Sequence, residues 1–296
     1  MESEIDSIFK NFNIQNLIND NLVLTNLQTT QSITENKSDE SKKSDELDKA
    51  FKVPKLIIKS EINNNWSILD IALKQPPVGW VNFFESCGDE LKIINNILQK
   101  YESSNCISYP YRKNIFKAFN LVKPENIKVI IFDLEPYNSN NLDGVPLATG
   151  LALSVNKNCY KIPNNVLNIY RELQIEYPDF KIPNHGNLEK WCESGIFLLN
   201  LSLTVKPNSP GSHKDLWTGF VIRVIEYLNS IDKSIPYILL HKDCLKIVNY
   251  ISGKSTIFKI DNPGFNNSNL FNSNIFKKVN SILEKKDKSV INWNSL

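Results

Sequence analysis

The sequence has few of the side chains that bind metals or form disulfides. Its 296 residues include five cysteines and three histidines, and no two cysteines form a CxxC pair. Disulfide frameworks and cysteine zinc sites need paired cysteines at suitable spacing, so neither is predicted. Three scattered histidines do not predict a metal site either, and we expect no metal and no other cofactor. These residues are Cys87, Cys106, Cys159, Cys192, Cys244, His185, His213 and His241.

Long apolar runs are also lacking. No stretch approaches the ~18 apolar residues that a membrane helix requires, so a membrane-spanning segment is not expected. The N-terminus carries Glu2, Glu4 and Asp6 and lacks the basic and apolar regions of a secretory signal. We therefore expect a protein of a reducing compartment that is not secreted.

Net charge is close to balance, with 34 basic and 32 acidic side chains and a formal charge of +2. Residues 1–50 hold ten acidic and five basic side chains, a net −5, which leaves +7 for the remainder. A mildly basic body behind an acidic N-terminal segment is compatible with a polyanionic partner, although +7 is also an ordinary solubilising charge.

Apolar patterning divides the chain into three parts. Residues 1–26 have apolar groups at near-helical spacing and are a possible interaction motif. Residues 27–60 are largely polar without periodicity, which predicts a disordered linker. From 61 to 296 short apolar runs alternate with helical periods, which predicts one domain. Expected strands are 127–132, 196–199, 237–240 and 255–260, and expected helices are 91–101, 166–173, 219–228, 245–250 and 275–283.

This alternation predicts an α/β fold of three α/β/α layers around a central four-stranded parallel sheet. In such folds ligands bind outside the carboxyl ends of the strands. The corresponding segments are Asp133–Asn138, Asn200–Thr204, His241–Asp243 and Asp261–Phe265.

Several of these segments carry motifs. Ile127–Asn138 reads IKVIIFDLEPYN, Gly195–Val205 reads GIFLLNLSLTV and Phe276–Trp293 ends in INW. Together with Ser154–Trp191 they resemble family 1 uracil-DNA glycosylases, in matching order and spacing from about Pro76 to Leu296. The resemblance implies that fold, and an activity that flips a deoxyuridine out of the base stack and hydrolyses its N-glycosidic bond.

The resemblance also assigns site residues. Asn200 corresponds to the Asn that reads the pyrimidine edge, and Tyr137 to the Tyr that excludes a 5-methyl group. The catalytic Asp is replaced by Glu135, and the His that donates to the uracil oxygen aligns with Asn262. The other two substrate-binding positions also differ from the family. Leu134 replaces a Gln there, and Leu153 replaces the Phe that stacks on the base.

The same alignment places six residues at the expected DNA-facing edge. A histidine on a surface loop is expected to contact a backbone phosphate, and lysines to act as point charges. Phe265 is an apolar residue near this edge, and core packing is the favoured expectation for it over a contact with DNA. The six positions are Ser212, His213, Lys214, Lys242, Gly264 and Phe265.

Three functions follow from these motifs and stay open. The favoured one is an inactive or weakly active DNA-binding or interaction module in repair or replication. The first alternative is an active, divergent uracil-DNA glycosylase that uses Glu135 and Asn262. The second is a protein-binding scaffold without DNA affinity. The resemblance implies a monomer in the nucleus, or in the cytoplasm if the chain belongs to a cytoplasmic DNA virus.

A separate motif suggests a protein partner. Residues 2–9, ESEIDSIF, have the spacing of a sliding-clamp-binding box, with Ile5, Ile8 and Phe9 as the inserting side chains. An amphipathic turn of this kind can insert into an apolar groove. An incidental apolar cluster in an N-terminal helix explains the same pattern.

Overall fold

The computed structural model of the chain describes residues 66–102 and 107–296. The expected interaction motif at 1–26, with Ile5, Ile8 and Phe9, and the expected linker at 27–60 lie outside these residues. They stay predictions, as does the domain boundary at residue 61.

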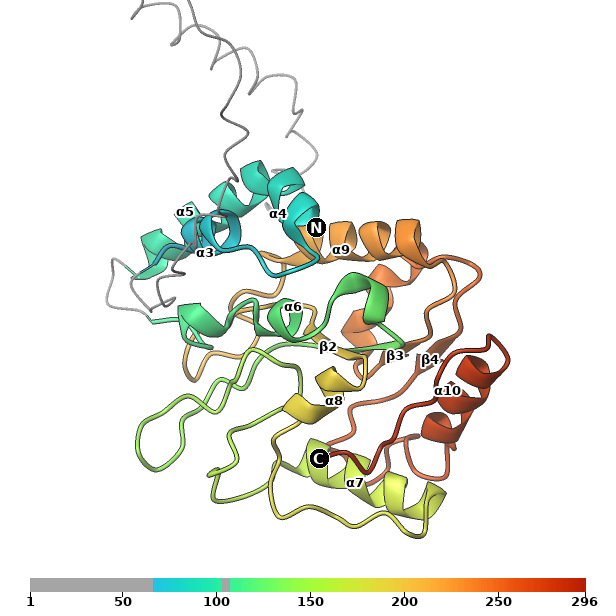
Figure 1. The fold of residues 1–296 in the computed structure, drawn as a ribbon. Helices are drawn as coiled ribbons and strands as arrows, with labels where there is room; N and C mark the ends of the chain where they lie inside the picture. Colours follow the sequence, from blue (N-terminus) through green and yellow to red (C-terminus); the bar gives the residue numbers. More distant parts are fainter. Residues whose placement is uncertain (1–65, 103–106) are drawn as a thin grey trace, which may run out of the picture. The chain divides into compact units, whose positions relative to one another are not determined.

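Four parallel strands form the centre of the fold (Figure 1). Their order across the sheet is β2-β1-β3-β4, so the two central strands are β1 and β3. The bounds are β1 Val129–Asp133, β2 Ile196–Asn200, β3 Tyr237–Leu239 and β4 Ile257–Lys259. β1 and β2 are buried almost throughout, which explains their continuous apolar sequence. The predicted fold class and all four strands are confirmed.

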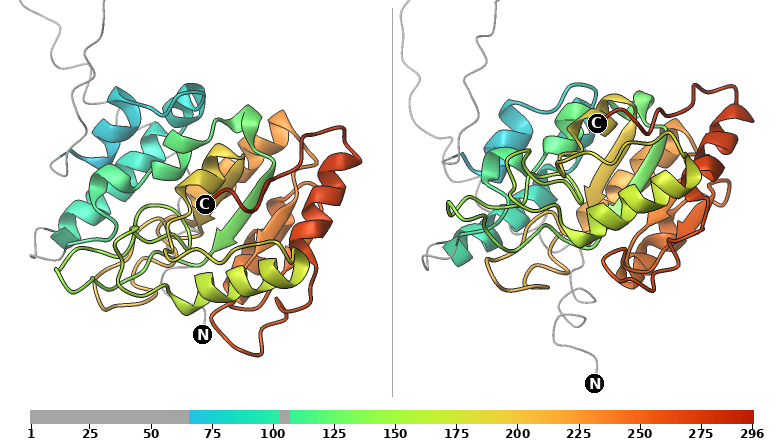
Figure 2. Two further views of the ribbon diagram at one scale, coloured as in Figure 1. Left: turned by 60° about the horizontal axis from the view of Figure 1, so that its bottom comes forward. Right: turned by 90° about the horizontal axis from the view of Figure 1, so that it is seen from below.

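Helices cover both faces of the sheet. Figure 1 shows α3, α4, α5 and α9 on one side and α7 and α10 on the other, and the views of Figure 2 agree. The helices longer than seven residues coincide with the predicted ones, except that 245–250 forms the end of a 3-10 helix. The bounds are α3 Ile68–Lys74, α4 Val81–Ser86, α5 Gly88–Glu102, η1 Arg112–Asn114, α6 Lys117–Leu121, η2 Pro124–Asn126, α7 Asn164–Glu176, α8 Glu189–Glu193, α9 Thr218–Ile231, η3 Lys242–Tyr250 and α10 Ile275–Glu284.

Aromatic side chains fix the first helical layer to the sheet. Trp80 is fully buried and stacks on Phe197 of β2, with ring centroids 5.4 Å apart. Its Nε1 donates to the carbonyl of Val122 at 2.8 Å, so the indole carries no unpaired polar group into the core. The packing on this face holds β2, and therefore the end of β2, in a fixed place. Among the described helices, none is long and apolar enough to span a bilayer.

Candidate active site at the carboxyl ends of the strands

The ends of β1 and β2 place two polar side chains next to each other. Asp133 and Asn200 are register partners, so their side chains project from the same face of the sheet. The strands stay paired beyond their ends, because the N–H of Leu201 donates to the carbonyl of Asp133 at 2.8 Å. The N–H of Ser202 donates in turn to the carbonyl of Leu134 at 2.9 Å. The site therefore begins on rigid backbone.

Asn200 is buried, and its side-chain oxygen lacks a hydrogen-bond partner among the described residues. Its side chain is 5% exposed, and Oδ1 has no hydrogen-bond partner within the described part of the chain. Leaving a buried acceptor unpaired costs about 1–3 kcal/mol. A ligand N–H would satisfy this oxygen, and the predicted role of Asn200 in reading a base edge stays a prediction.

Glu135 joins two loops through its carboxylate. The N–H of Gly211 lies 2.8 Å from Oε2 and 3.1 Å from Oε1. Gly211 has a φ of +75°, a conformation that favours glycine, and this turn directs its N–H at the carboxylate. Burial raises the pKa of Glu135, and the bond from Gly211 opposes that rise. In this structure the glutamate is therefore a link between the loop after β1 and the turn that contains Gly211.

Tyr137 is held in place by its hydroxyl group. The oxygen lies 2.9 Å from the carbonyl oxygen of Leu153 and 2.8 Å from Oδ1 of Asn165, near the start of α7. Burial raises the pKa of the Tyr137 phenol, with a further contribution from the charge of Asp133. The phenol of Tyr137 therefore stays neutral.

Leu153 belongs to the core. It is 2% exposed, and its φ of +67° is unusual for a residue with a branched side chain. This backbone turns the Leu153 carbonyl toward Tyr137 while the side chain packs inward. Leu134 is half-buried and packs against the same core. Neither leucine offers an aromatic surface for a base, so the predicted substrate contacts of both residues stay predictions.

Asn262 forms a turn in the loop after β4. Its Oδ1 accepts the N–H of Gly264 at 2.8 Å, and Nδ2 of Asn168 in α7 donates to the carbonyl of Pro263 at 2.8 Å. The Asn262 carbonyl also accepts from the N–H of Phe265. The loop is therefore fastened to α7, and the acceptor end of the Asn262 amide serves the turn.

Some of the residues predicted to contact DNA are exposed, and others already interact with groups of the chain itself. Lys242 is exposed, and Phe265 is 60% exposed, so Phe265 is not a core residue. Lys214 lies 3.4 Å from a carboxylate oxygen of Asp243, which partly neutralises it. Ser212 accepts a backbone N–H with its hydroxyl oxygen, and Gly264 is half-buried. The lysines and Phe265 remain available to a ligand.

His213 is a correction to the expected surface histidine. Its side chain is 2% exposed, stacks on Tyr101 with centroids 5.5 Å apart, and places Nδ1 2.9 Å from Oγ1 of Thr204. Burial lowers the pKa of His213 to about 4, with a further contribution from Lys206. The ring is neutral and enclosed, so it does not face a phosphate on the surface. A ring on α5 covers it, and loop polarity in the sequence could not show that contact.

Two site residues escaped the sequence analysis. Asp133 was visible only as the polar end of a strand, and burial raises its pKa to about 6. Its Oδ1 accepts the N–H of Leu134 at 2.8 Å. Asn165, which contacts Tyr137, lies in an asparagine-rich stretch that gives no local signal. In the described ranges no three His, Cys, Asp or Glu side chains are grouped as metal ligands.

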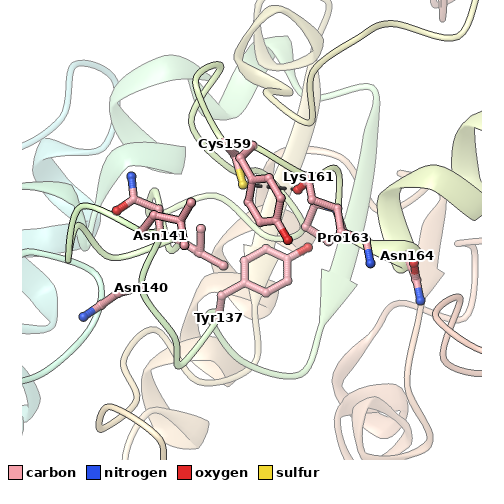
Figure 3. Close-up of a pocket in the computed structure, with 10 residues that line it drawn as sticks. Tyr137, Asn140, Asn141, Cys159, Lys161, Pro163 and Asn164 are labelled. Carbon is pink, nitrogen blue, oxygen red and sulfur yellow. Dashed lines mark hydrogen bonds between the residues drawn. The ribbon is translucent and has the colours of Figure 1, made fainter.

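A pocket of about 360 Å³ adjoins Tyr137 on the loops that precede α7 (Figure 3). Tyr137 forms one wall, and Cys159, Lys161 and Pro163 come from the segment that leads into the helix. Asn140 and Asn141 come from the loop after β1. Tyr137 thus lines the pocket with its ring while its hydroxyl group contacts Leu153 and Asn165.

Comparisons with known proteins address the family of the chain. No family model matches the sequence. The uracil-DNA glycosylase of Proteus mirabilis is 32% identical over 206 residues, which cover 68% of this chain and 88% of the relative. That of Francisella tularensis subsp. novicida is 36% identical over 200 residues, covering 66% and 88%.

A solved structure shares the architecture. The crystal structure of mimivirus uracil-DNA glycosylase superposes with a TM-score of 0.69 at 25% identity, and the match covers 79% of this chain and 90% of that chain. The sequence relatives and the structural neighbour thus agree on one family across the domain that carries the site. This chain belongs to the uracil-DNA glycosylase family.

Proposed function

We propose that this chain is a DNA-binding member of the family, acting in repair or replication, with little or no uracil excision of its own. Its relatives are named for an enzyme that acts on uracil in DNA. The strand-end edge that would meet DNA carries the exposed lysine Lys242 and the exposed ring of Phe265. Both suit binding to a polyanion with unstacked bases.

The observation that carries the proposal is the position of the Glu135 carboxylate. A carboxylate that positions water and stabilises a sugar cation must face the substrate, whereas both oxygens of Glu135 face Gly211. The longer side chain of glutamate makes this reach possible. A displacement of about 1 Å at a reacting group can reduce the rate about a hundredfold.

Replacement of the histidine supports the same conclusion. Loss of one donor at a developing oxyanion typically costs ~10²–10³ in rate. Asn262 uses its Oδ1 within its own turn. The Asn262 amide could still donate through Nδ2, so this loss is an upper value. The two losses belong to one catalytic unit and do not simply multiply.

The active alternative assigns catalysis to Glu135 and Asn262 in these positions. It requires Glu135 to leave Gly211 when DNA binds. The scaffold alternative requires that the strand-end edge has no affinity for DNA. A monomeric state, and a location in the nucleus or cytoplasm, also stay predictions.

The test is single-turnover release of uracil from single-stranded DNA with the protein in large excess. We expect slow or undetectable release by the chain as it stands. We expect faster release by the double variant Glu135→Asp, Asn262→His. The shorter side chain of aspartate withdraws the carboxylate from Gly211, and histidine restores the hydrogen-bond donor to the uracil oxygen. Adding Asn200→Ala to this double variant should abolish the faster release. This control shows whether the release depends on the predicted base-reading residue.

Two outcomes would contradict the proposal. Rapid release by the unchanged chain that Glu135→Gln abolishes would favour the active glycosylase. Absence of any salt-dependent DNA binding by the unchanged chain would favour the protein scaffold.

A further inference from the structure

The pocket beside Tyr137 has the composition of a nucleobase site. Its volume of about 360 Å³ is at the lower end of the range for ligand pockets. Aromatic, aliphatic and amide side chains line it, with one lysine and no carboxylate. The lining comprises Tyr137, Asn140, Asn141, Leu142, Leu147, Cys159, Tyr160, Lys161, Pro163 and Asn164.

Tyr160 is the more exposed of the two tyrosines that line this pocket. Its side chain is 79% exposed, although large aromatic groups usually bury most of their surface. It lies in the segment that leads into α7, between Cys159 and Lys161. An exposed ring at the wall of a pocket offers a face for stacking, and bases stack on such rings with about 1–3 kcal/mol each.

A hairpin-like loop forms the facing wall. The N–H of Asn141 donates to the carbonyl of Val145 at 2.8 Å, and that of Leu147 to the carbonyl of Ser139 at 3.0 Å. These bonds hold the loop in shape and leave Leu142 at its tip, 84% exposed. An ordered loop that presents an apolar side chain beside a pocket is suited to packing against a ligand with a flat apolar face.

The charges and amides favour an anionic strand over a cationic or purely apolar ligand. Lys161 lines the pocket, and Lys157 is exposed in the same segment. Asp143 at the tip of the facing loop opposes them, and the N–H of Asp143 donates to Oδ1 of Asn141. Asn140 and Asn164 add amide groups, which pair with base edges.

We propose that this pocket holds a base of the DNA strand neighbouring the nucleotide at Asn200, stacked on Tyr160. The inference rests on the proposed DNA binding and adds a second contact to it. Tyr137 lines the pocket and follows β1, whose last residue Asp133 is the register partner of Asn200. A base in the pocket would therefore lie against the loop that continues the strand next to Asn200.

The experiment measures affinity of the full chain for single-stranded oligonucleotides that contain deoxyuridine flanked on one side or the other by 2-aminopurine. Binding is followed by anisotropy and stacking by quenching of the 2-aminopurine fluorescence. We expect quenching for one of the two oligonucleotides. Tyr160→Ala should remove it and weaken binding roughly 5- to 150-fold, the equivalent of about 1–3 kcal/mol. Tyr160→Phe keeps the ring and should bind within about twofold of the unchanged chain.

Tyr250→Ala is the matched control. Tyr250 is a 42% exposed tyrosine at the end of η3, and its carbonyl accepts from Asn229 near the carboxyl end of α9, away from the carboxyl ends of the strands. Its substitution should leave DNA binding unchanged.

The outcomes separate this inference from the proposed function. If the unchanged chain binds DNA but Tyr160→Ala binds equally well, the pocket is not a base site and the proposed function stands. If the unchanged chain binds no DNA, both fail. If thymidine monophosphate alone binds as tightly as the oligonucleotides, the pocket takes a free nucleotide and the assignment to a DNA strand is wrong.

Discussion

At the scale of single residues, the site contains a half-buried carboxyl group, that of Asp133, on the strand next to Asn200. Asp133 ends a strand whose other side chains are apolar, and burial raises its pKa to about 6. The nearby charge of Glu135 raises it further, while the N–H of Leu134 opposes the shift. The folded chain therefore binds a proton at Asp133 more tightly than the unfolded chain does.

This shift gives Asp133 a defined effect on stability. A raised folded-state pKa means that the free energy of unfolding falls as pH rises from about 4 to about 6 and then levels off. Asp133→Asn keeps an acceptor for Leu134 and removes the charge. We expect Asn to stabilise the fold by about 1–3 kcal/mol at about pH 7.5 and to have little effect near pH 4, measured by urea denaturation. Lower stability of the variant at the higher pH would contradict the burial argument.

Glycine is required at one turn because of a close backbone contact. Gly150 has a φ of +88°, and a Cβ at this position would lie 1.8 Å from the carbonyl oxygen of Asn114. Gly144 has a similar φ of +74° but open space around it. Gly144→Ala should cost about 1 kcal/mol for its backbone strain alone, and Gly150→Ala clearly more. If thermal denaturation showed equal losses of stability for the two variants, the backbone around residue 150 would move to accommodate the added Cβ at little cost.

At the scale of elements, α7 holds α10 through two buried glutamates. Oε2 of Glu172 accepts the N–H of Asn272 at 2.7 Å, and Oε2 of Glu176 accepts that of Lys277 at 2.6 Å. Oε1 of Glu176 accepts the N–H of Phe276 at 3.2 Å. Glu176 thus satisfies N–H groups of the first turn of α10 that have no partner within the helix, and Glu172 binds the segment just before it.

The junction should respond to pH through Glu176. Burial and the neighbouring Glu172 raise the pKa of Glu176, and the bonds from the start of α10 oppose them. With a raised folded-state pKa, stability at this junction falls as pH rises through that pKa. Glu176→Gln should reduce the pH dependence of the melting temperature between about pH 5 and 8. Glu176→Ala should lower the melting temperature at every pH, because it leaves the N–H groups of α10 unpaired. An unchanged pH profile in the Gln variant would assign the dependence elsewhere.

Local sequence predicts the long elements of this fold better than it predicts the contacts of the site. The apolar runs of β1 and β2 and the period of α9 require only neighbouring residues, so they were predicted correctly. The short helices α4 and α8 lack a full period and were missed. The bond between Glu135 and Gly211 joins residues far apart in the sequence, and the burial of His213 depends on Tyr101. Such contacts form only when distant segments pack together.

At the scale of the whole molecule, DNA binding is expected to depend on a small number of free cations. Lys214, which lies between β2 and α9, is paired with Asp243, whereas Lys242 at the start of η3 is exposed. Lys242→Ala should weaken binding to every single-stranded sequence alike and reduce the slope of log affinity against log salt by about 0.7. Lys254→Ala, an exposed lysine in the segment that enters β4, is the control. A sequence-dependent loss would show that Lys242 reads bases.

The strand order affects how fast the molecule folds. Val129 of β1 pairs with Ile196 of β2, and Ile130 of β1 with Tyr237 of β3, so both neighbours of β1 are distant from it in the sequence. Loops of this size must close before the sheet gains stability, which slows folding. The buried Trp80, Trp191 and Trp217 would report that step by fluorescence. Pairing of the distant strands then sets the folding barrier, so substitutions confined to the loops at the carboxyl ends of the strands are expected to change the folding rate little.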